Sequence, residues 1–389
     1  MSGTCDVIVL GAGMAGASLA AELATVRRVV LVEAEDQPGR HATGRSAAVF
    51  FESYGNATVR ALTRASRAFL ERPPAGFAEV PLVTPRSALF VADSGRVAGL
   101  DAMLSLPDAD PGLRRLEVAE ALRRCPILRP DWIAGGVLDP SGRDLDVAAI
   151  HSGYLRTARR LGVRIVLGAS GCTVERAGAG WRVGWRDARF EAPVIVNAAG
   201  AWADRVARQA GVRPIGLQPL RRTAVMLPPP PGHDPSGWPM VIDVDEEFYF
   251  KPDAGQLLLS PANEDPSEPC DAAPDELDVA VAVDRFERAT TVTVTRIGRR
   301  WAGLRSFVAD RSPVAGFDDD AAGFFWLAGQ GGYGIQMAPA LARAAAALVT
   351  GCPLPDDIAA RGVTAAMLAP SRPSLQPRPA TSGSPPAQC

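Results

Sequence analysis

The first 33 residues of the chain constrain its fold more than any other segment. Residues 6–10 form a short apolar run, and Gly11, Gly13 and Gly16 follow it directly. Residues 17–24 are small and suit a helix, and residues 29–32 are apolar again. Two buried strands joined by a tight glycine turn and a helix make a β-α-β unit, which predicts a parallel sheet with helices on its faces.

The glycine turn and the acid that follows the second strand predict a dinucleotide site. Gly11 permits the tight turn, Gly13 lets the backbone approach a pyrophosphate, and Gly16 lets helix and strand pack closely. The helix N-terminus would face the phosphates with unpaired amides and the positive end of its dipole. Glu33 ends the second strand, where it can accept hydrogen bonds from ribose hydroxyls. The alternative is a glycine-rich turn in an ordinary β-α-β unit.

The rest of the chain indicates a discontinuous architecture. Residues 221–227 alternate like a strand, and residues 246–260 suggest a hairpin, so the texture from about 216 is that of an antiparallel sheet. From residue 324 the sequence again predicts a buried strand, a glycine-rich turn and a small-residue helix, the same kinds of element as in the first 33 residues. We therefore predict an α/β protein, α+β overall, with a Rossmann-like cofactor domain and a second domain built on a mixed or antiparallel β-sheet.

The predicted domain boundaries follow from these changes in sequence pattern. The cofactor domain takes residues 1–80, 144–215 and 305–368, and the substrate domain takes residues 81–143 and 216–304. Residues 369–389 are rich in proline, serine and alanine, which predicts a disordered tail.

Composition limits the partners and the location of the chain. Its 389 residues carry a net charge of −2, which gives no general attraction to nucleic acid or anionic lipid. Six cysteines without a CxxC pair favour reduced thiols in the cytoplasm. Three histidines show no metal-ligand spacing, and no apolar run suits a membrane span, so we expect neither a metal nor a spanning segment.

The segment from Glu33 to Ser46 resembles the FAD superfamily of D-amino acid oxidases and glycine oxidases. FAD is longer than the space above one turn, so a second loop with small and hydroxyl side chains must follow the first. Two further runs, residues 194–202 and 329–336, resemble later cofactor turns of that superfamily. Within it, residues 301–310 and 330–336 are most similar to the bacterial D-arginine dehydrogenases, and the resemblance extends to about residue 368.

The resemblance implies FAD as the cofactor and a set of residues that contact it. These are Gly11, Gly13, Met14, Ala15, Gly16, Glu33, Ala34, Arg40, Thr43, Gly44, Arg45, Ser46, Ala47, Ala48, Val174, Ala199, Gly200, Trp202, Gly303, Gly331, Gly332, Tyr333, Gly334, Ile335 and Gln336.

The same resemblance implies catalytic roles for five residues. Arg222 and Arg305 would hold a substrate carboxylate, because a guanidinium binds a carboxylate with two parallel hydrogen bonds and stays charged. Arg221 is adjacent to Arg222 and could exchange roles with it. Hydroxyl contacts would come from Tyr54 and Tyr249, and the carbonyl of Gly332 would accept from the substrate amine.

Some positions depart from the pattern of the arginine-oxidising enzymes. Ala88 stands where those enzymes have a glutamate that meets the substrate guanidinium, and Val49 stands where they have a histidine. A cationic side chain buried without a carboxylate partner is costly. Phe50 and Phe51 also differ, and Glu52 could restore a negative contact if it points inward. The departures predict a pocket for neutral or apolar side chains.

These observations predict FAD-dependent oxidative deamination of a D-amino acid. Hydride would pass from Cα to flavin N5, and the imino acid would be hydrolysed to a 2-oxo acid and ammonia. Oxygen or a quinone-type carrier would then reoxidise the flavin. Two alternatives stay open, namely oxidation of a 2-hydroxy acid or of a secondary amine such as N-methylglycine, and a flavin-binding protein without small-molecule turnover.

Overall fold

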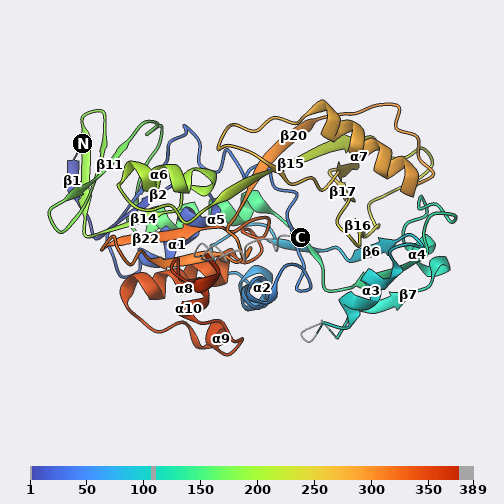
Figure 1. Cartoon of the computed structure of the whole chain (residues 1–389), viewed down its shortest axis with the longest axis horizontal. Helices are drawn as coiled ribbons and strands as arrows, with labels where there is room; N and C mark the ends of the chain where they lie inside the picture. Colours follow the sequence, from blue (N-terminus) through green and yellow to red (C-terminus); the bar gives the residue numbers. More distant parts are fainter. Residues whose placement is uncertain (1, 107–110, 376–389) are drawn as a thin grey trace, which may run out of the picture.

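The computed structural model describes residues 2–106 and 111–375 of the chain. Within these ranges the strands form a six-stranded, a nine-stranded, a four-stranded and a three-stranded sheet. Figure 1 shows the six-stranded and four-stranded sheets at one end of an elongated molecule and most of the nine-stranded sheet at the other. Strands β15 and β20 run from the second region toward the first.

The six-stranded sheet has the strand order β10-β3-β2-β14-β22-β21, parallel except for β21. Helix α1 (Met14–Leu23) joins β2 to β3, which confirms the predicted β-α-β unit. The strands are β2 (Val7–Leu10), β3 (Val29–Val32), β10 (Arg164–Val166), β14 (Val194–Asn197), β21 (Val314–Phe317) and β22 (Phe324–Ala328).

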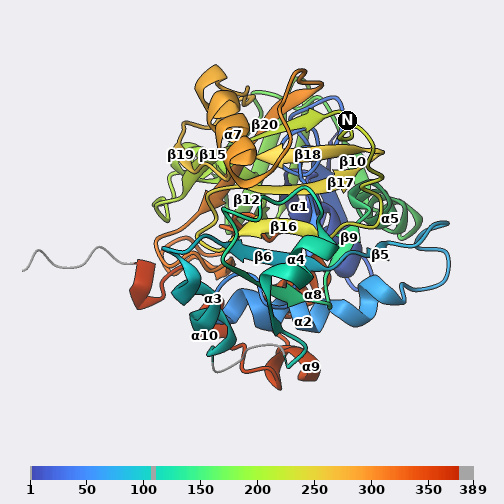
Figure 2. The ribbon, with the colours of Figure 1, turned by 90° about the vertical axis from the view of Figure 1, so that its right-hand side faces the viewer.

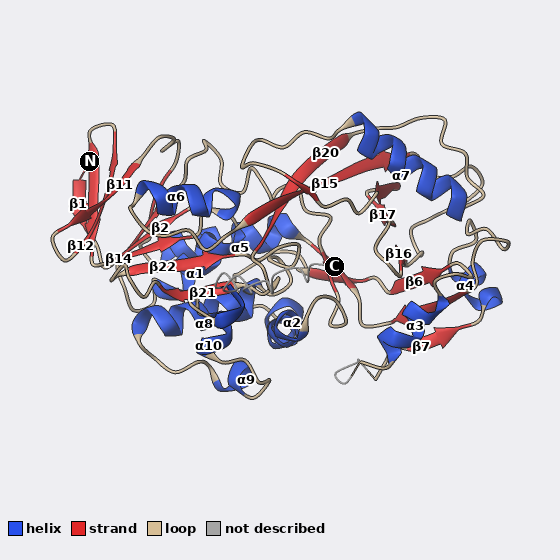
Figure 3. Ribbon diagram, viewed as in Figure 1, coloured by secondary structure: helices blue, strands red, loops and turns tan. Residues whose placement is uncertain are grey.

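Both faces of this sheet are buried, which explains why its strands are continuous apolar runs. Val7 and Val9 pack on the face that carries α1, α5 (Val147–Arg160) and α8 (Ala338–Thr350). Ile8 and Leu10 pack on the opposite face, against α6 (Ala203–Gln209) and the four-stranded sheet. Successive side chains of a strand point to opposite faces, so each face receives an apolar layer. Figure 3 shows helices on the two sides of these strands.

The four-stranded sheet closes the outer face of the six-stranded one. Its strands are β1 (Ser2–Thr4), β11 (Thr173–Ala177), β12 (Gly180–Trp185) and β13 (Ala188–Ala192).

The nine-stranded sheet is mixed and mostly antiparallel, as the second half of the fold prediction stated. Only β16 and β6 pair in parallel. Helix α7 (Glu276–Ala289) packs over β15 and β18, as Figure 2 shows. The strands are β6 (Ala88–Ala92), β7 (Arg114–Leu116), β8 (Gly135–Asp139), β15 (Gln218–Leu227), β16 (Met240–Asp243), β17 (Tyr249–Asp253), β18 (Gln256–Ser260), β19 (Asp265–Pro266) and β20 (Arg300–Phe307).

Short elements fill the space between the two large sheets. The three-stranded sheet consists of β4 (Val49–Phe50), β9 (Arg143–Leu145) and β5 (Val83–Pro85). The remaining helices are α2 (Ala57–Glu71), α3 (Val97–Leu104), α4 (Val118–Arg124), α9 (Asp356–Ala359) and α10 (Ala365–Leu368), with 3-10 turns at Gly200–Trp202 and Pro373–Leu375.

One connection between the two regions positions the candidate site. The end of β20 forms an isolated bridge, Ser306 to Gly331, with the glycine-rich turn after β22. The Gly331 amide donates to the Ser306 carbonyl at 2.9 Å. Strand β20 pairs along its whole length with β15. The bridge therefore carries residues of the nine-stranded sheet to the edge of the six-stranded one.

The predicted tail differs from the structure at its beginning. Residues 369–375 pack against the rest of the protein, because the buried guanidinium of Arg372 ion-pairs with Asp310 and donates to three carbonyl groups. Composition alone missed this anchor, since one arginine in a proline-rich segment gives no periodic signal. Residues 376–389 lie outside the described ranges.

Candidate functional site

A cavity of about 550 Å³ lies where the carboxyl ends of the parallel strands meet β15, β17 and β20. Leu10, Val32 and Ala198 line it from the first region, and Arg222, Tyr249 and Arg305 line it from the second. In open α/β sheets ligands bind at the carboxyl ends of the strands. The cavity therefore joins the predicted dinucleotide site to the predicted substrate site.

The glycine turn is shaped so that a ligand can approach the backbone. Gly11 has φ +96°, and a Cβ on it would lie 2.5 Å from the carbonyl oxygen of Ala198. A Cβ on Gly16 would lie 1.8 Å from the carbonyl oxygen of Gly11, so α1 packs directly on the turn. These positions require glycine, for the reasons that the sequence pattern suggested.

The buried carboxylate of Glu33 ties the turn to the second strand. Its Oε2 accepts a hydrogen bond from the Ala12 amide at 2.6 Å, and its Oε1 accepts from the Glu35 amide at 3.0 Å. The carboxylate lines the cavity and keeps further lone pairs for a ligand hydroxyl. Glu33 thus stabilises the turn in addition to any contact with a ribose.

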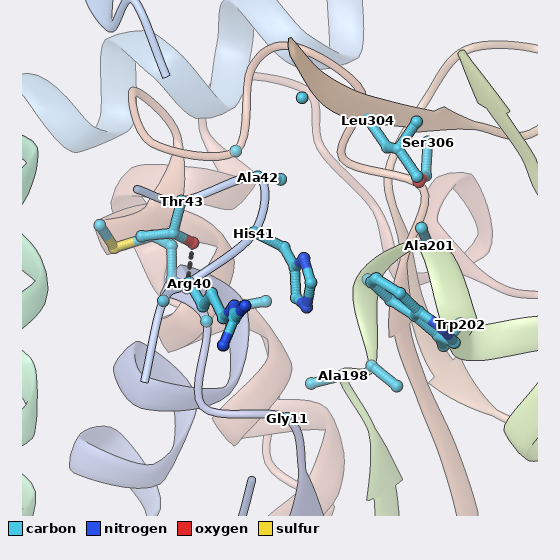
Figure 4. Close-up of a pocket in the computed structure, with 18 of the residues that line it drawn as sticks. Gly11, Arg40, His41, Ala42, Thr43, Ala198, Ala201, Trp202, Leu304 and Ser306 are labelled. Carbon is cyan, nitrogen blue, oxygen red and sulfur yellow. Dashed lines mark hydrogen bonds between the residues drawn. The ribbon is translucent and has the colours of Figure 1, made fainter. Parts of the chain in front are cut away.

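The second loop, residues 39–48, lies beside the turn. The Met14 amide at the start of α1 donates to Thr43 Oγ1 at 3.0 Å (Figure 4). Arg40 and Arg45 both ion-pair with Asp271, and Arg45 also donates to the carbonyl oxygens of Ala272 and Ala302. The loop between β19 and α7 therefore crosses to the cofactor side of the cavity, where ion pairs hold it.

His41 was not among the predicted site residues, yet it lies inside the cavity. Its Nε2 is 2.8 Å from Glu35 Oε1, and its ring centroid is 4.6 Å from that of Trp202. Figure 4 shows the two rings facing each other. The segment 169–172, after β10, also lines the cavity and was missed. Its place at the carboxyl end of a parallel strand was the available signal.

Most of the predicted cofactor residues line this cavity. They are Gly11, Gly13, Met14, Ala15, Glu33, Ala34, Arg40, Thr43, Arg45, Ser46, Ala47, Ala199, Gly200, Trp202, Gly303, Gly331, Gly332, Gly334 and Ile335.

The other predicted cofactor residues lie behind the lining. Gly16 packs on the turn, and the Gly44 amide closes the second loop onto the Gly39 carbonyl. Ala48 and Val174 pack in hydrophobic clusters, Val174 within the four-stranded sheet.

Two predicted residues near the glycine-rich turn use their side chains within the protein. Gln336 is buried, and its side chain bonds the Phe51 amide at 3.2 Å and the Thr63 hydroxyl at 3.0 Å. The ring of Tyr333 packs edge-on against Tyr54, at a centroid distance of 5.0 Å.

Of the two arginines predicted to bind a carboxylate, Arg305 is the one that has no carboxylate partner in the part of the chain that the structure describes. Among the described residues it forms no ion pair with a carboxylate within 4.0 Å. Burial lowers the pKa of Arg305, but Tyr54, Tyr249 and Glu246 outweigh burial and the pKa is raised overall. A guanidinium held this way is ready to receive an external carboxylate.

Arg222 is buried and already partly engaged. Its Nε donates to the Asn263 carbonyl at 2.7 Å, and its Nη2 lies 3.2 Å from Glu264 Oε1. Burial and the nearby charge of Arg305 lower its pKa. Arg222 lines the cavity, whereas Arg221 faces the opposite side of the strand and pairs with Asp278 and Asp265.

Tyr249 lies beneath the two arginines. Its ring centroid is 6.0 Å from the Arg222 guanidinium carbon. Burial raises the pKa of Tyr249, but the positive charges of Arg305 and Arg222 more than offset this, so its pKa falls below the usual value. The pKa of the Tyr249 hydroxyl therefore depends on the charge of a ligand that binds next to these arginines.

Tyr54 lies outside the cavity lining, next to Glu246. Its hydroxyl donates to Glu246 Oε2 at 3.0 Å, and burial raises its pKa. Glu246 has φ +56° in the turn between β16 and β17. Burial raises the pKa of Tyr333, and the negative charge of Glu246 raises it further. Sequence reasoning missed Glu246, because its position depends on that turn.

The wall behind Tyr249 is apolar. A cluster of buried side chains includes Phe51, Ala88 and Ile242, with Val49 and Ala47 packed against it. Glu52 does not add a charge to this wall, since its carboxylate ion-pairs with Arg64 and Arg67 of α2. Of these residues only Ala47 and Tyr249 line the cavity itself, and the neutral substrate pocket stays a prediction.

Residues 2–106 and 111–375 hold no group of three or more histidine, cysteine or carboxylate side chains placed to bind a metal ion. No helix in these ranges has the length and apolar content needed to cross a membrane.

The residues present fit FAD. The glycine cradle admits a pyrophosphate without a Cβ in the way, and the same cavity continues to Arg305 and Tyr249. A dinucleotide seated on the turn would thus place its distal ring against the predicted substrate site.

Comparison with known sequences gives two kinds of match. Residues 6–348 match the DAO family, described as FAD dependent oxidoreductase. The curated relatives include the tRNA 5-methylaminomethyl-2-thiouridine biosynthesis bifunctional protein MnmC of Burkholderia pseudomallei, 29% identical over 344 residues. That alignment covers 82% of this chain and 49% of the relative, so the chain spans about half the length of the curated relatives it matches.

Solved structures with the same fold include enzymes named for several different small-molecule substrates. L-proline dehydrogenase from P. horikoshii has a TM-score of 0.77 at 20% identity and covers 91% of this chain and 96% of its own. Glycine oxidase from Geobacillus kaustophilus has 0.77 at 20%, covering 90% and 95%. Iminodiacetate oxidase from Chelativorans sp. BNC1 has 0.77 at 23%, covering 90% and 96%.

The family match confirms the predicted cofactor and superfamily, and the structural matches confirm the fold. The D-arginine dehydrogenase detail finds no support among them. This chain belongs to the DAO family of FAD-dependent oxidoreductases.

Proposed function

We propose that this protein oxidises a D-amino acid with a neutral or apolar side chain to the corresponding imino acid. The observation that carries the proposal is Arg305, a cation in the cofactor cavity with no carboxylate partner among the described residues, held beside Gly332. The substrate carboxylate would bind Arg305 and the free edge of Arg222. The D configuration follows the resemblance of residues 301–310 and 330–336.

The protein would contribute orientation and charge placement. With the carboxylate held, the Gly332 carbonyl would accept from the amine and the apolar wall near Tyr249 would take the side chain. Bound FAD supplies the hydride acceptor. The Cα–H bond breaks with both electrons, the nitrogen lone pair forms the C=N bond, and water then converts the imine to a 2-oxo acid and ammonia.

A secondary amine is the second candidate, and the comparisons favour it over a 2-hydroxy acid. The curated relatives are named for a methylaminomethyl group, which is a secondary amine, and one structural neighbour is an iminodiacetate oxidase. An N-substituted glycine would use the same arginines and direct its substituent to the apolar wall. We also propose that the protein is cytoplasmic and that either oxygen or a quinone-type carrier is the electron acceptor.

Anaerobic reduction of the bound flavin separates these candidates. The FAD-loaded protein is mixed with D- and L-forms of leucine, methionine and alanine, with N-methylglycine, and with a 2-hydroxy acid. The proposal predicts bleaching by a D-amino acid. Bleaching by N-methylglycine alone would support the secondary amine, and bound flavin that nothing reduces would favour a protein without turnover.

A further inference from the structure

A carboxylate, that of Glu264, lies next to Arg222, one of the two arginines proposed to bind the substrate. A site that binds anions would be expected to lack a negative charge at this place. Glu264 Oε1 lies 3.2 Å from Arg222 Nη2. The same carboxylate receives two hydrogen bonds from Arg311, at 2.8 and 3.0 Å. Burial raises the pKa of Glu264, but Arg311 and then Arg222 outweigh it and the pKa is lowered. Glu264 is therefore ionised at neutral pH.

The backbone around Glu264 is fixed by contacts that leave it little freedom. Ala262 has φ +51°, an uncommon conformation for a residue with a side chain. The neighbouring Asn263 accepts from the Thr223 amide at 2.9 Å and donates to Asp265 and Asp278. These bonds tie the segment that carries Glu264 to β15 and α7.

Arg311 is held just as firmly on the other side of Glu264. Its backbone has φ +57°, and its guanidinium carbon lies 3.8 Å from the ring centroid of Phe307. A cation with two hydrogen bonds and a stacked ring keeps the carboxylate of Glu264 turned toward Arg222.

The ionisable groups that influence one another at this end of the cavity give a definite total charge. Counted as formal charges, Arg222, Arg305 and Arg311 contribute +3, and Glu246 and Glu264 contribute −2. The total is +1. A substrate with one carboxylate brings it to zero, whereas a second carboxylate leaves an excess negative charge beside a buried arginine.

We propose that Glu264, held by Arg311, is a specificity-determining residue that restricts the arginine site to substrates with a single carboxylate. The inference rests on the proposed function, because it assumes that Arg305 and Arg222 bind the substrate carboxylate. It goes beyond that function by assigning the exclusion of dicarboxylates to a residue that acts through Arg222. Iminodiacetate, with two carboxylates, would be a poor ligand for this chain.

Ligand binding by the FAD-loaded protein tests the inference without turnover. Butanoate and succinate have the same number of carbons and differ in one carboxylate, and their binding is read from the change they cause in the flavin spectrum. The wild type should bind butanoate on the order of tenfold more tightly than succinate, the effect of one charge at roughly 12 Å with an effective dielectric constant of about 20.

Three variants and a control separate charge from structure. Glu264→Gln keeps the shape and removes the charge, so the preference for butanoate should fall on the order of tenfold. Arg311→Gln lowers the total to zero, so both anions should bind more weakly. The double variant restores +1 and should recover most of the wild-type preference. Glu276→Gln removes an exposed acid paired with Arg300 and should behave as wild type.

The two single variants decide the matter, because a merely structural role for the Glu264–Arg311 pair would weaken binding of both anions in each of them, whereas the charge rule weakens it only in Arg311→Gln. Equal binding of the two anions by the wild type would overturn the inference, and so would an unchanged preference in Glu264→Gln. A wild-type spectrum that neither anion changes would overturn it too. If the predicted pattern is found but no amino acid reduces the flavin, the proposed function fails while the charge rule stands.

Discussion

The guanidinium of Arg305 lies directly against Gly332: a Cβ on Gly332 would stand 2.8 Å from Cζ of Arg305. The contact follows from the bridge between Ser306 and Gly331, which joins the end of β20 to the turn after β22. The absence of a side chain at position 332 thus determines where the arginine rests. In the proposed function the Gly332 carbonyl would accept from the substrate amine.

Gly332→Ala should therefore impair substrate binding without loss of cofactor. The backbone of Gly332 is outside the left-handed region, so alanine is tolerated and only the guanidinium must move. We expect KM for the amino acid to rise about tenfold or more, since small displacements of binding groups cost this much. Steady-state kinetics measures KM, and the visible spectrum measures FAD content. Gly237→Ala, where a Cβ meets nothing within 4 Å, is the matched control. An unchanged KM would contradict the assigned position of Arg305.

Glu33→Gln should weaken FAD binding. The amide group that replaces one carboxylate oxygen cannot accept from a backbone N–H, so either the Ala12 or the Glu35 amide loses its partner. Loss of a buried acceptor costs about 1–3 kcal/mol, so the Kd for FAD should rise about tenfold to a hundredfold. Titration of apoprotein with FAD measures this. Glu175→Gln, at an exposed site on β11, should leave the Kd unchanged, and equal Kd values for the two variants would refute the role of Glu33.

The lowered pKa of Tyr249 predicts weaker anion binding at alkaline pH. An acid whose folded pKa is depressed ionises earlier in the folded protein, so the phenolate forms below its usual pH near 10. The phenolate then offsets one positive charge, and the Kd of butanoate should rise with pH. Butanoate has no amine, so its own titration does not interfere. In Tyr249→Phe the rise should move to higher pH or vanish. A wild-type Kd that stays constant up to pH 10 would count against this account.

Much of the fold was predictable because its signals are local. The glycine turn, the two buried strands and the hairpin at 246–260 each depend on neighbours within a few residues, and β17 and β18 confirm that hairpin. The same holds for the cofactor loop, because short glycine-containing segments carry it. Val174 is an exception among the predicted cofactor residues. Residues 169–172 line the cavity, whereas Val174 lies on the following strand, β11, and packs in a hydrophobic cluster.

The residues that sequence reasoning missed come from loops whose positions depend on distant pairing. Glu246 and Glu264 reach the arginines only because β15 lies between β18 and β20 and because two non-glycine residues adopt positive φ. The direction of Glu52 was likewise unpredictable, because it depends on where the arginines of α2 lie. Charge in a loop has no periodicity, so the chain gives no local signal for it.

Arg372→Ala should destabilise the protein and leave FAD binding intact. Arg372 is buried, and its loss removes the ion pair with Asp310 and the guanidinium donor of three carbonyl groups. We expect the free energy of unfolding to fall by about 2 kcal/mol, less than for a fully buried pair. Chemical denaturation measures this, and Arg372→Lys should retain part of the stability. A loss below about 0.5 kcal/mol, the range of ordinary surface substitutions, would contradict the anchor.

The same pair predicts an acid limb in the stability profile. Arg372, Ser374 and the Ser312 amide outweigh burial and lower the pKa of Asp310 to about 2. A carboxyl with a depressed folded pKa adds stability above its unfolded pKa, and this stability disappears as the pH falls from about 4 toward 2. The difference in stability between wild type and Arg372→Ala should therefore shrink over that interval.

The central claim is that this chain holds a D-amino acid through Arg305 so that its Cα hydrogen meets bound FAD. Anaerobic mixing of the FAD-loaded protein with D-leucine and with Cα-deuterated D-leucine tests it most directly. The account predicts that both bleach the flavin, that the deuterated form does so more slowly, and that Arg305→Gln abolishes bleaching while keeping its FAD. Flavin that stays bound and oxidised with every amino acid, in either enantiomer, would contradict the account.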